Sequence, residues 1–454
     1  MRHQDAASSS TAQWRSESKD LPTLNANGHP KPRFLNQQPH SDDVHQDRTS
    51  IKLGKIDGTH LLVHSVLRAF SPAPRALGEW QDFVTKSPKW AQVKHLFNGM
   101  GIVMFAGGSG TFPQALVSAV YLRQTLECDL PIEIWRLETE VGPTGKLENF
   151  CSNLDISLRV VGGAYSRRTT NKYTYKPAVI ALSSFDKVLF LDSDAVLVRT
   201  PAALFADLHG HKTAVFWRDF WTLQRNASIW QHVGGWPGGH SEYHPSQESG
   251  ILMVCKSCGG WSPLLLCWYF NFHHQLYYDA IYKGRYHGSH GEGDKDTFQV
   301  AWQALEVPFQ MMHPPAVIGP LIEDPPRKVC GGTIAQLDWQ RRLLVMHHNA
   351  NKWRYSDWVS SRFETLGMSH FAQLQHEEEA NHADGMDDLH SAEIYTYQRQ
   401  GIGWCVTYNL PTHIRPLQEV LGYDLERRFI DLISLVYDSE MIQEFIASTK
   451  ENHN

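Results

Sequence analysis

The pattern of apolar and polar residues is clearest around residues 187–194. Four consecutive apolar residues, Val188 to Leu191, are followed by the triplet Asp192-Ser193-Asp194. An uninterrupted apolar run that includes a β-branched and an aromatic residue predicts a strand buried on both faces. Residues i and i+2 of an extended backbone point the same way, so Asp192 and Asp194 are expected to project together where the strand ends.

The flanks of this strand make the pattern more restrictive. Residues 173–182 predict a helix with a proline in its first turn, and residues 195–199 predict a second short strand. Thr200 and Pro201 are suited to the N-cap and first position of another helix. An isolated Asp-x-Asp triplet is most often a solvated turn, whereas the ordered set of helix, strand, triplet, strand and helix favours a functional site.

A strand–helix–strand unit precedes this region. Residues 101–105 and 130–135 predict buried strands, and residues 112–126 predict the helix between them, so the two strands should lie parallel in one sheet. The turn at residues 106–110 is rich in glycine, which lets the backbone approach a nucleotide closely. Its spacing matches neither the dinucleotide-binding nor the P-loop pattern, so a plain tight turn is an equal alternative.

The remaining pattern predicts an α/β fold with appendages. Residues 222–247 form a Gly-, Trp- and His-rich segment that we expect to be a long loop able to cover a cleft. The other expected strands are 158–161, 213–217, 250–254 and 342–346, and the other expected helices are 261–283, 297–305 and 415–447. The predicted organisation is a disordered polar tail at 1–50, a helical lead-in at 51–98, a single catalytic domain at 99–370, and an acidic, His-rich segment with C-terminal helices at 371–454.

Composition excludes some classes of function. The 454 residues are 42% hydrophobic, enough for one large α/β domain. The formal net charge of −6 gives no basic excess, so nucleic acid is not an expected partner. Aromatic residues make up 11% of the chain and include 15 Trp, a content typical of sugar-binding clefts and equally of aromatic core packing.

Cysteine usage and hydropathy add little chemistry. Among seven cysteines, Cys255 and Cys258 form a C-x-x-C pair without a second pair at zinc-finger spacing, which favours a local disulfide or two ordinary thiols. Asn226 begins a glycosylation sequon that has meaning only in a secreted chain. No apolar run reaches about 18 residues and the N-terminus lacks a signal-peptide core, so we expect a soluble chain without a transmembrane helix.

The Asp-Ser-Asp triplet is the strongest chemical signal. Open α/β sheets bind their ligands at the carboxyl ends of the strands, which is where Asp192 and Asp194 are expected. Two carboxylates there supply hard oxygen ligands for a divalent metal that also binds diphosphate oxygens.

The order of motifs between residues 100 and 355 resembles a known family. The motifs are Leu130-Pro131-Ile132-Glu133, Lys176-Pro177, Leu182-Ser183-Ser184-Phe185, Phe190-Leu191-Asp192-Ser193-Asp194, Asp219-Phe220-Trp221, Glu248-Ser249-Gly250 and Gly293-Asp294-Lys295-Asp296-Thr297-Phe298. Together they resemble the fungal α-mannosyltransferases that extend outer chains in the Golgi, which are nucleotide-sugar glycosyltransferases with the GT-A fold. The tail, the lead-in and the C-terminal segment are outside this resemblance.

The resemblance implies a nucleotide-sugar donor, with GDP-mannose expected, a Mn²⁺ or Mg²⁺ ion, and a glycan or glycoprotein acceptor. Asp192 and Asp194 would bind the metal, joined by His347 or His348 from a late strand, unless these histidines have a surface or supporting role. The remaining residues implied in donor binding are Phe105, Ala106, Gly107, Lys176 and Ser193. Lys176 would pair with a donor phosphate, or would be a solvated lysine at a helix start.

The resemblance also implies retention of the anomeric configuration, which requires a group on the sugar face opposite the leaving group. Glu248 is the best-placed carboxylate by sequence order. Asp294 and Asp296 are candidates for binding donor or acceptor hydroxyls, and Asp219 is a further candidate at a strand end. Each could instead be a loop carboxylate, and Asp296 before Thr297 could be a helix cap.

Several alternatives stay open at this stage. A glycogenin-like enzyme that uses a UDP-sugar would share the Asp-x-Asp context, and a non-catalytic sugar- or nucleotide-binding module could share the fold. A hydrolase with paired carboxylates is weaker, because its acid and base must flank the bond. Members of the family normally carry an N-terminal membrane anchor, and this chain shows none. Residence in the Golgi lumen or on its membrane, a cytoplasmic location and an incomplete N-terminus therefore remain alternatives.

Overall fold

The structure is a computed structural model that describes residues 58–71, 73–167, 171–208, 212–282, 293–349, 352–374, 395–400, 403–408 and 412–451. Residues 56–454 form one compact unit, which is the part considered below. The predicted tail at 1–50 lies outside the described residues, as does much of the acidic, His-rich segment that begins at 371. None of the helices in the described ranges has the length and apolar character needed to cross a membrane.

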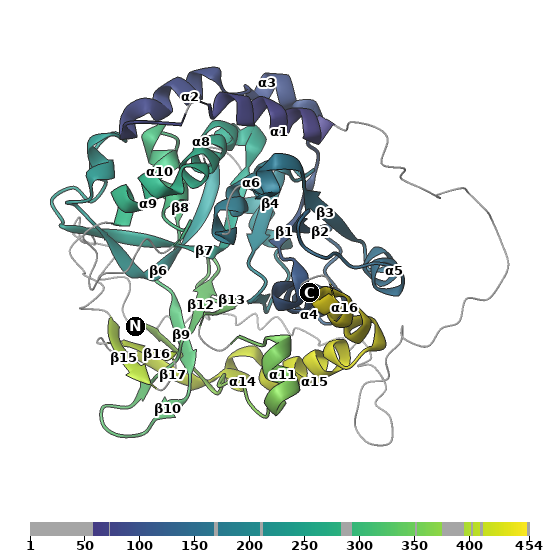
Figure 1. Ribbon diagram of the computed structural model, residues 1–454. Helices are drawn as coiled ribbons and strands as arrows, with labels where there is room; N and C mark the ends of the chain where they lie inside the picture. The colour runs from purple at the N-terminus through teal and green to yellow at the C-terminus, as the bar shows by residue number, and fades with distance from the viewer. Residues whose placement is uncertain are drawn as a thin grey trace, which may run out of the picture. The chain divides into compact units, whose positions relative to one another are not determined.

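A seven-stranded sheet forms the centre of the unit (Figure 1). Its strand order is β3-β2-β1-β4-β7-β6-β8, in which β3, β2, β1 and β4 run parallel and β7 is antiparallel to β4. The strands are β1 (Met100–Phe105), β2 (Ile132–Leu137), β3 (Ile156–Val161), β4 (Lys187–Leu191), β6 (Ala214–Gln224), β7 (Tyr243–Cys255) and β8 (Gln310–Met311). The α/β fold of the GT-A kind expected from the resemblance is confirmed.

Strand β4 separates two hydrophobic cores. Val188 and Phe190 face one cluster of buried residues, and Leu189 and Leu191 face the other. All four are 0% exposed, which is why the sequence shows an unbroken apolar run here. Burying each of these side chains contributes about 2 kcal/mol to stability, so the position at which β4 ends is strongly fixed.

Helices cover both faces of the sheet. The face of the sheet to which Phe190 points is covered by α6 (Lys176–Leu182), α8 (Trp261–Phe272), α9 (His274–Tyr282) and α10 (Thr297–Ala304). The helices α1 (Gly58–Ala69), α2 (Trp80–Lys86) and α3 (Trp90–Val93) pack outside these four. Phe70, after α1, packs edge-on against Trp268 of α8 with ring centroids 5.5 Å apart. The opposite face of the sheet, to which Leu191 points, is covered by α4 (Gly108–Gln124).

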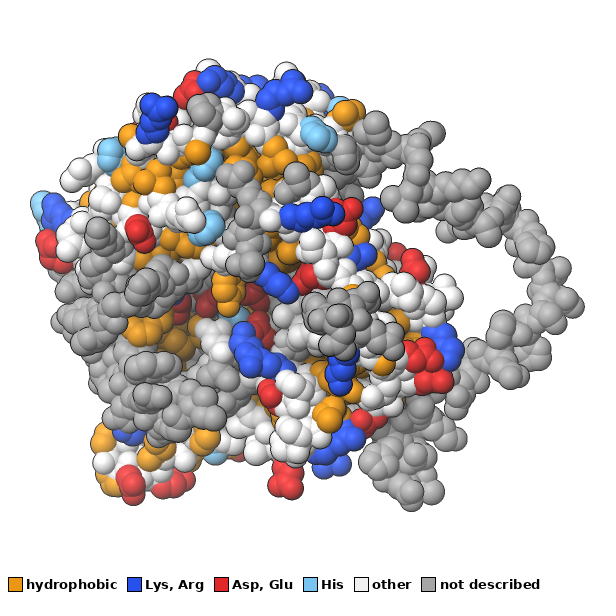
Figure 2. Space-filling model, in the orientation of Figure 1, with side chains coloured by type: hydrophobic (Ala, Val, Ile, Leu, Met, Phe, Trp, Pro, Cys, Tyr) orange, Lys and Arg blue, Asp and Glu red, His pale blue; other side chains and the backbone are white. Residues whose placement is uncertain are grey.

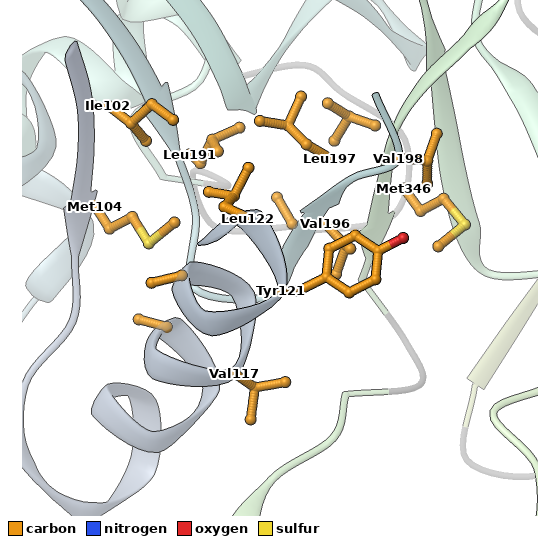
Figure 3. Close-up of a cluster of buried hydrophobic side chains, with 14 of the residues drawn as sticks. Ile102, Met104, Val117, Tyr121, Leu122, Leu191, Val196, Leu197, Val198 and Met346 are labelled. Atoms are coloured by element: carbon orange, nitrogen blue, oxygen red, sulfur yellow. The ribbon is translucent and has the colours of Figure 1, made fainter. Parts of the chain in front are cut away.

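A second, antiparallel sheet begins directly after the Asp-Ser-Asp triplet. Its order is β17-β14-β9-β12-β13-β5. The strands are β5 (Ala195–Leu197), β9 (Ala316–Gly319), β12 (Thr333–Leu337), β13 (Leu343–His348), β14 (His370–Leu374) and β17 (Thr412–Pro416). Figure 3 shows Leu122 of α4 between Leu191 of the first sheet and Val196 of the second, so one core fixes both flanks of the triplet.

The remaining elements complete the unit. The helices are α5 (Lys146–Asn153), α7 (Ala202–Asp207), α11 (Tyr355–Ser361), α14 (Leu417–Leu421), α15 (Leu425–Tyr437) and α16 (Glu440–Glu451). Two small ladders pair β10 (Leu321–Ile322) with β11 (Lys328–Val329) and β15 (Tyr395–Gln400) with β16 (Gly403–Tyr408). Short helical turns are η1 (Leu77–Glu79), η2 (Lys94–Leu96), η3 (Gly163–Arg167), η4 (Lys172–Tyr175), η5 (Ser228–Gln231) and η6 (Lys256–Gly260). Helix α15 packs on α4 through Phe429 and Tyr121, whose ring centroids are 5.7 Å apart.

Some expectations from the sequence need correction. The predicted loop 222–247 is shorter, because β7 begins at Tyr243 and its polar first half pairs with β6. The predicted helix 261–283 breaks at His273 into α8 and α9. Pro201 rather than Thr200 is the N-cap of α7. Of the alternatives for Cys255 and Cys258, the structure has the local disulfide.

Candidate active site

The two carboxylates of the triplet leave the sheet at a tight turn between β4 and β5. The backbone N–H of Asp192 donates to the carbonyl of Gly250 on β7 at 2.9 Å, and the N–H of Ala195 donates to the carbonyl of Asp192 at 3.0 Å. The side chain of Asp192 is 25% exposed and that of Asp194 is 5% exposed. The turn therefore holds one acid at the surface of the site and the other beneath it.

His347 on β13 completes a group of three potential metal ligands. Its Nε2 atom lies 3.2 Å from Oδ1 of Asp194 and 3.9 Å from Oδ2 of Asp192. One atom from each of the three side chains lies within 4.8 Å of the others. Strand β13 supplies this histidine because it pairs with β5 in a register that places His347 opposite Ala195.

His348 points the other way, as successive residues of a strand do. Its ring is fully buried and packs edge-on against Trp353, with centroids 5.1 Å apart. Its Nδ1 atom lies 3.4 Å from the hydroxyl of Thr333. Of the two predicted histidines, the structure brings His347 to the carboxylates and places His348 in the core beside them.

Glu248 of β7 contacts the opposite side of the His347 ring. Its Oε1 atom lies 3.3 Å from Nδ1 of His347 and accepts the N–H of Gly250 at 2.7 Å. Burial alone would raise the pKa of Glu248, but His347 and the Gly250 amide lower it to about 2. Burial likewise opposes a charged His347, whereas Glu248 and Asp194 hold the pKa of His347 well above its usual value.

Gly250 makes room for the imidazole. A Cβ atom at this position would lie 2.4 Å from both Cε1 and Nδ1 of His347. The glycine of the Glu248-Ser249-Gly250 motif is therefore required by close packing against His347.

Lys176, at the start of α6, is 3% exposed, so it is not the solvated lysine that its helix position also allowed. Its ammonium group lies 3.0 Å from Oδ1 of Asp192 and 3.3 Å from Oδ2 of Asp294, and it donates to the hydroxyl and carbonyl of Ser249 at 3.0 Å. Burial lowers the pKa of Lys176, but Asp192 and Asp294 outweigh that effect and the pKa is raised. This buried cation joins β4, β7 and the segment before α10.

Lys352 is a site residue that the sequence did not single out. Its ammonium group forms a close ion pair with Oδ2 of Asp194, and its side chain is 31% exposed. Burial would raise the pKa of Asp194, but His347 and Lys352 lower it. A single lysine in a polar segment after a strand gives no signal by which such a role could be recognised.

Asp294 is buried beside Lys176. The hydroxyl of Ser249 lies 3.4 Å from its Oδ1, and its Oδ2 lies 3.3 Å from the ammonium group of Lys176. Burial raises the pKa of Asp294 to about 6, although Lys176 lowers it. An ionised carboxylate has about four lone-pair sites, so beside its pair with Lys176 it can also accept a hydroxyl group of a ligand.

Asp296 has a different environment from Asp294. Its carboxylate accepts hydrogen bonds from the hydroxyl of Ser246 at 2.9 Å, the N–H of Gln247 at 2.8 Å and the amide of Gln299 at 2.7 Å. It occupies the N-cap position of α10 without a side-chain capping bond. The contacts indicate a residue that positions β7 against α10, whereas the predicted contact of Asp296 with a sugar stays a prediction.

The Asp296→Ala variant is expected to lower the free energy of unfolding by about 3 kcal/mol, because it removes the shared acceptor of three buried hydrogen bonds. Urea denaturation measures this difference. Asp279→Ala, on the outer side of α9, serves as the matched control and should change stability by less than about 0.5 kcal/mol. A stable Asp296→Ala protein that has lost activity would instead support the direct role predicted from the sequence.

Asp219 of β6 pairs with a lysine of the segment before α10. Its Oδ2 atom lies 2.6 Å from the ammonium group of Lys295, and its Oδ1 accepts the N–H of Phe220 at 2.6 Å. Burial and the charge of Glu248 raise the pKa of Asp219, while Lys295 lowers it. Asp219 is therefore electrostatically linked to Glu248 and anchors the segment that carries Asp294.

The residues predicted to line the nucleoside follow β1, which pairs with β4 in the register Met104 to Leu191. Ala106 is buried, and the ring of Phe105 lies 6.0 Å from that of Tyr175. A Cβ atom at Gly107 would lie 2.1 Å from a carboxylate oxygen of Glu140.

Figure 2 shows a hollow in which acidic and histidine atoms gather, with basic atoms at its edge.

The donor set fits a divalent metal. Two carboxylates and an imidazole nitrogen are ligands that Mn²⁺ accepts. The second ring nitrogen of His347 faces Glu248, and a carboxylate in this position orients a metal-binding histidine. Ser193, between the two acids, is buried.

Comparison with protein families identifies the chain. A family model described as "Mannosyltransferase putative" matches residues 99–234 and 239–338. The chain belongs to this mannosyltransferase family. The match includes every motif on which the resemblance was based, and it contains Asp192, Asp194, Glu248 and Asp294 but ends before His347.

The chain is similar to curated α-1,2-mannosyltransferases of fungi. The chain is 26% identical over 284 residues to the α-1,2-mannosyltransferase MNN2 of Candida albicans, covering 52% of this chain and 46% of that protein. It is 24% identical over 278 residues to the α-1,2-mannosyltransferase MNN5 of Saccharomyces cerevisiae, covering 49% and 46%. The chain thus spans about half the length of the curated relatives it matches.

Solved structures with a similar arrangement are glycosyltransferases. Mouse xyloside xylosyltransferase 1 aligns with a TM-score of 0.29 and 12% identity, covering 47% of this chain and 85% of that one. The galactosyltransferase LgtC, in complex with donor and acceptor sugar analogs, aligns with a TM-score of 0.31 and 15% identity, covering 47% and 73%.

Proposed function

We propose that this chain is a metal-dependent, retaining α-mannosyltransferase that transfers mannose from GDP-mannose to a glycan or glycoprotein acceptor. The observation that carries the proposal is the convergence of Asp192, Asp194 and His347 at the carboxyl end of β4. Family membership and the α-1,2-mannosyltransferase names of the fungal relatives support mannose as the transferred sugar. A glycan acceptor in the Golgi is what the resemblance of the motifs implies.

Asp192, Asp194 and His347 would hold the ion, with Mn²⁺ preferred. The metal, when bound, acts as a Lewis acid that offsets the charge of the departing nucleoside diphosphate. Lys176 and Lys352 add positive charge beside the same carboxylates, Lys176 from within the core and Lys352 from a more exposed position. Both cations would favour the binding of a diphosphate at this edge of the sheet.

Asp294 and Glu248 would have separate roles. The carboxylate of Asp294, whose Oδ2 pairs with Lys176, has further lone pairs and would accept a hydroxyl group of the sugar. Glu248 holds Nδ1 of His347 and keeps a negative charge near the sugar, where it would stabilise an oxocarbenium-like state. Attack by the acceptor from the leaving-group side would then retain the anomeric configuration.

The test is a donor panel with and without Mn²⁺. Hydrolysis and transfer should saturate with GDP-mannose and not with UDP-sugars, and a chelator should abolish both. Turnover with UDP-glucose or UDP-galactose instead would favour a glycogenin-like enzyme. Donor binding without turnover of any sugar nucleotide would contradict the enzyme and favour the non-catalytic module.

The pH dependence of transfer should report Asp294. An acid whose pKa is raised to about 6 is neutral below that pH, so it no longer balances Lys176 and accepts a hydroxyl more weakly. At saturating Mn²⁺, kcat/KM is expected to fall about tenfold per pH unit below pH 6 and to level off above it. In the Asp294→Asn variant, this fall of kcat/KM below pH 6 should be absent, and kcat/KM should be lower at every pH. If kcat/KM falls below pH 6 in the same way in the wild type and in Asp294→Asn, another group causes the fall.

A further inference from the structure

A pocket away from the carboxylates is lined by four arginines. Its volume is about 170 Å³, and Arg199, Arg341, Arg342 and Arg415 line it together with Leu343, Phe371 and Val420. We propose that this pocket binds a phosphoryl group, as a second anion site distinct from the catalytic centre. The inference does not depend on the proposed function.

Three separate segments bring the four arginines together. Arg199 follows β5, Arg341 and Arg342 belong to the hairpin between β12 and β13, and Arg415 lies on β17. The pairing of β14 with β17 places Phe371 opposite Arg415. The arrangement thus depends on the second sheet as a whole, and a chance cluster along one exposed helix would not produce it.

Among the residues that the structure describes, one of the four arginines in the pocket wall has an acidic partner at ion-pair distance. Arg342 forms an ion pair with Asp338 at 2.7 Å. Arg199 donates from Nε to the carbonyl of Leu343 at 3.0 Å, which leaves its terminal nitrogens for another acceptor. Within the described ranges no ion pair involves Arg199 or Arg415. Guanidinium groups stay charged at all accessible pH values, so their mutual repulsion favours a bound anion.

The backbone of the hairpin supports the same inference. Arg341 has a φ of 59°, in the left-handed region where glycine or asparagine is favoured. Its N–H donates to the carbonyl of Asp338 at 2.9 Å, which fixes this conformation at the end of the turn. Arginine occupies a position where glycine would be less strained, and strain of this kind often marks a ligand-binding segment.

Shape and chemistry select the ligand class. The volume of about 170 Å³ is smaller than the about 300–1,000 Å³ typical of sites for drug-sized ligands. Arginine forks match the oxygens of phosphate in paired hydrogen bonds. Phe371 is buried at the wall of the pocket and lowers its polarity, which strengthens such contacts.

The pocket and the metal ligands lie at opposite ends of β13. Leu343 begins the strand and His347 is four residues further on, about 13 Å at the rise of a strand. A phosphoryl group at one end would therefore be separate from a donor at the other. The phosphate could belong to a soluble phosphorylated compound or to a lipid headgroup, and the experiment separates these sources.

The test measures thermal unfolding with inorganic phosphate against sodium chloride at equal ionic strength, with a chelator present so that the metal site does not contribute. At ten times the dissociation constant, phosphate is expected to raise the midpoint of the wild type by about 2 °C. The Arg199→Gln/Arg415→Gln double variant should lose this shift. Arg68→Gln, an exposed arginine of α1, should keep it.

A second variant covers the case in which the double variant does not fold. Arg341→Gly relieves the left-handed backbone, so it should unfold at the same or a higher temperature in chloride while its phosphate shift decreases. Equal phosphate shifts in all variants, or no shift in the wild type, would overturn the proposal. Sedimentation with phosphatidylcholine vesicles that contain phosphatidylglycerol then separates the two sources of the phosphate. Binding of the wild type but not of the double variant assigns the phosphate to a lipid headgroup. Binding of neither protein assigns it to a soluble compound.

Discussion

The Asp194→Ala variant is expected to lose at least about 1000-fold in kcat/KM for sugar transfer, because a metal that offsets leaving-group charge contributes several kcal/mol to the transition state. Asp194 is the acid that His347 contacts most closely and that pairs with Lys352. Removing it takes away one metal ligand and leaves two cations without their shared partner. Steady-state kinetics across a Mn²⁺ titration measures the loss.

Asp129→Ala is the matched control, because Asp129 is an exposed acid in the connection between α4 and β2. This variant should keep kcat/KM within about twofold of the wild type. Near-normal activity of a folded Asp194→Ala protein at all Mn²⁺ concentrations would contradict the assignment of Asp194.

The Gly250→Ala variant is expected to weaken Mn²⁺ binding by about 10- to 100-fold, the range seen when the support of a metal ligand is disturbed. The added methyl group would lie 2.4 Å from the His347 ring, so the imidazole has to move away from Asp194 and Glu248. Overpacking in this buried site should also lower the free energy of unfolding by about 1–3 kcal/mol. Calorimetric titration with Mn²⁺ and urea denaturation measure the two effects.

Gly110→Ala provides the control for this prediction. Gly110 lies in the first turn of α4, and a Cβ atom there would meet nothing within 4 Å. It should leave Mn²⁺ affinity unchanged and stabilise the helix by up to about 1 kcal/mol. If Gly250→Ala binds Mn²⁺ as tightly as Gly110→Ala, the metal does not use the observed position of His347.

The sequence predicted the first sheet, and the edge at which its two carboxylates lie, well. The apolar run before Asp192 is long enough to specify a strand buried on both faces, and its end fixes where the acids project. The strand–helix–strand pattern likewise predicted β1, α4 and β2. These elements depend on local periodicity, which one sequence shows directly.

The second sheet and the partners of the site depend on long-range pairing. Strands β9 and β14 are only four and five residues long, and nothing in their sequences shows that they pair. The choice between His347 and His348 depends on which face of β13 meets β5. Lys352 and the role of Gly250 depend on side chains that only the folded chain brings together, so local pattern could not reveal them.

The most direct test of the account is a crystal structure with bound Mn²⁺, in which anomalous scattering locates the ion. The account predicts one peak at coordination distance from Asp192, Asp194 and Nε2 of His347, with Glu248 still on the other ring nitrogen. A peak bound by other residues, or crystals that take up no Mn²⁺ at this edge of the sheet, would contradict it.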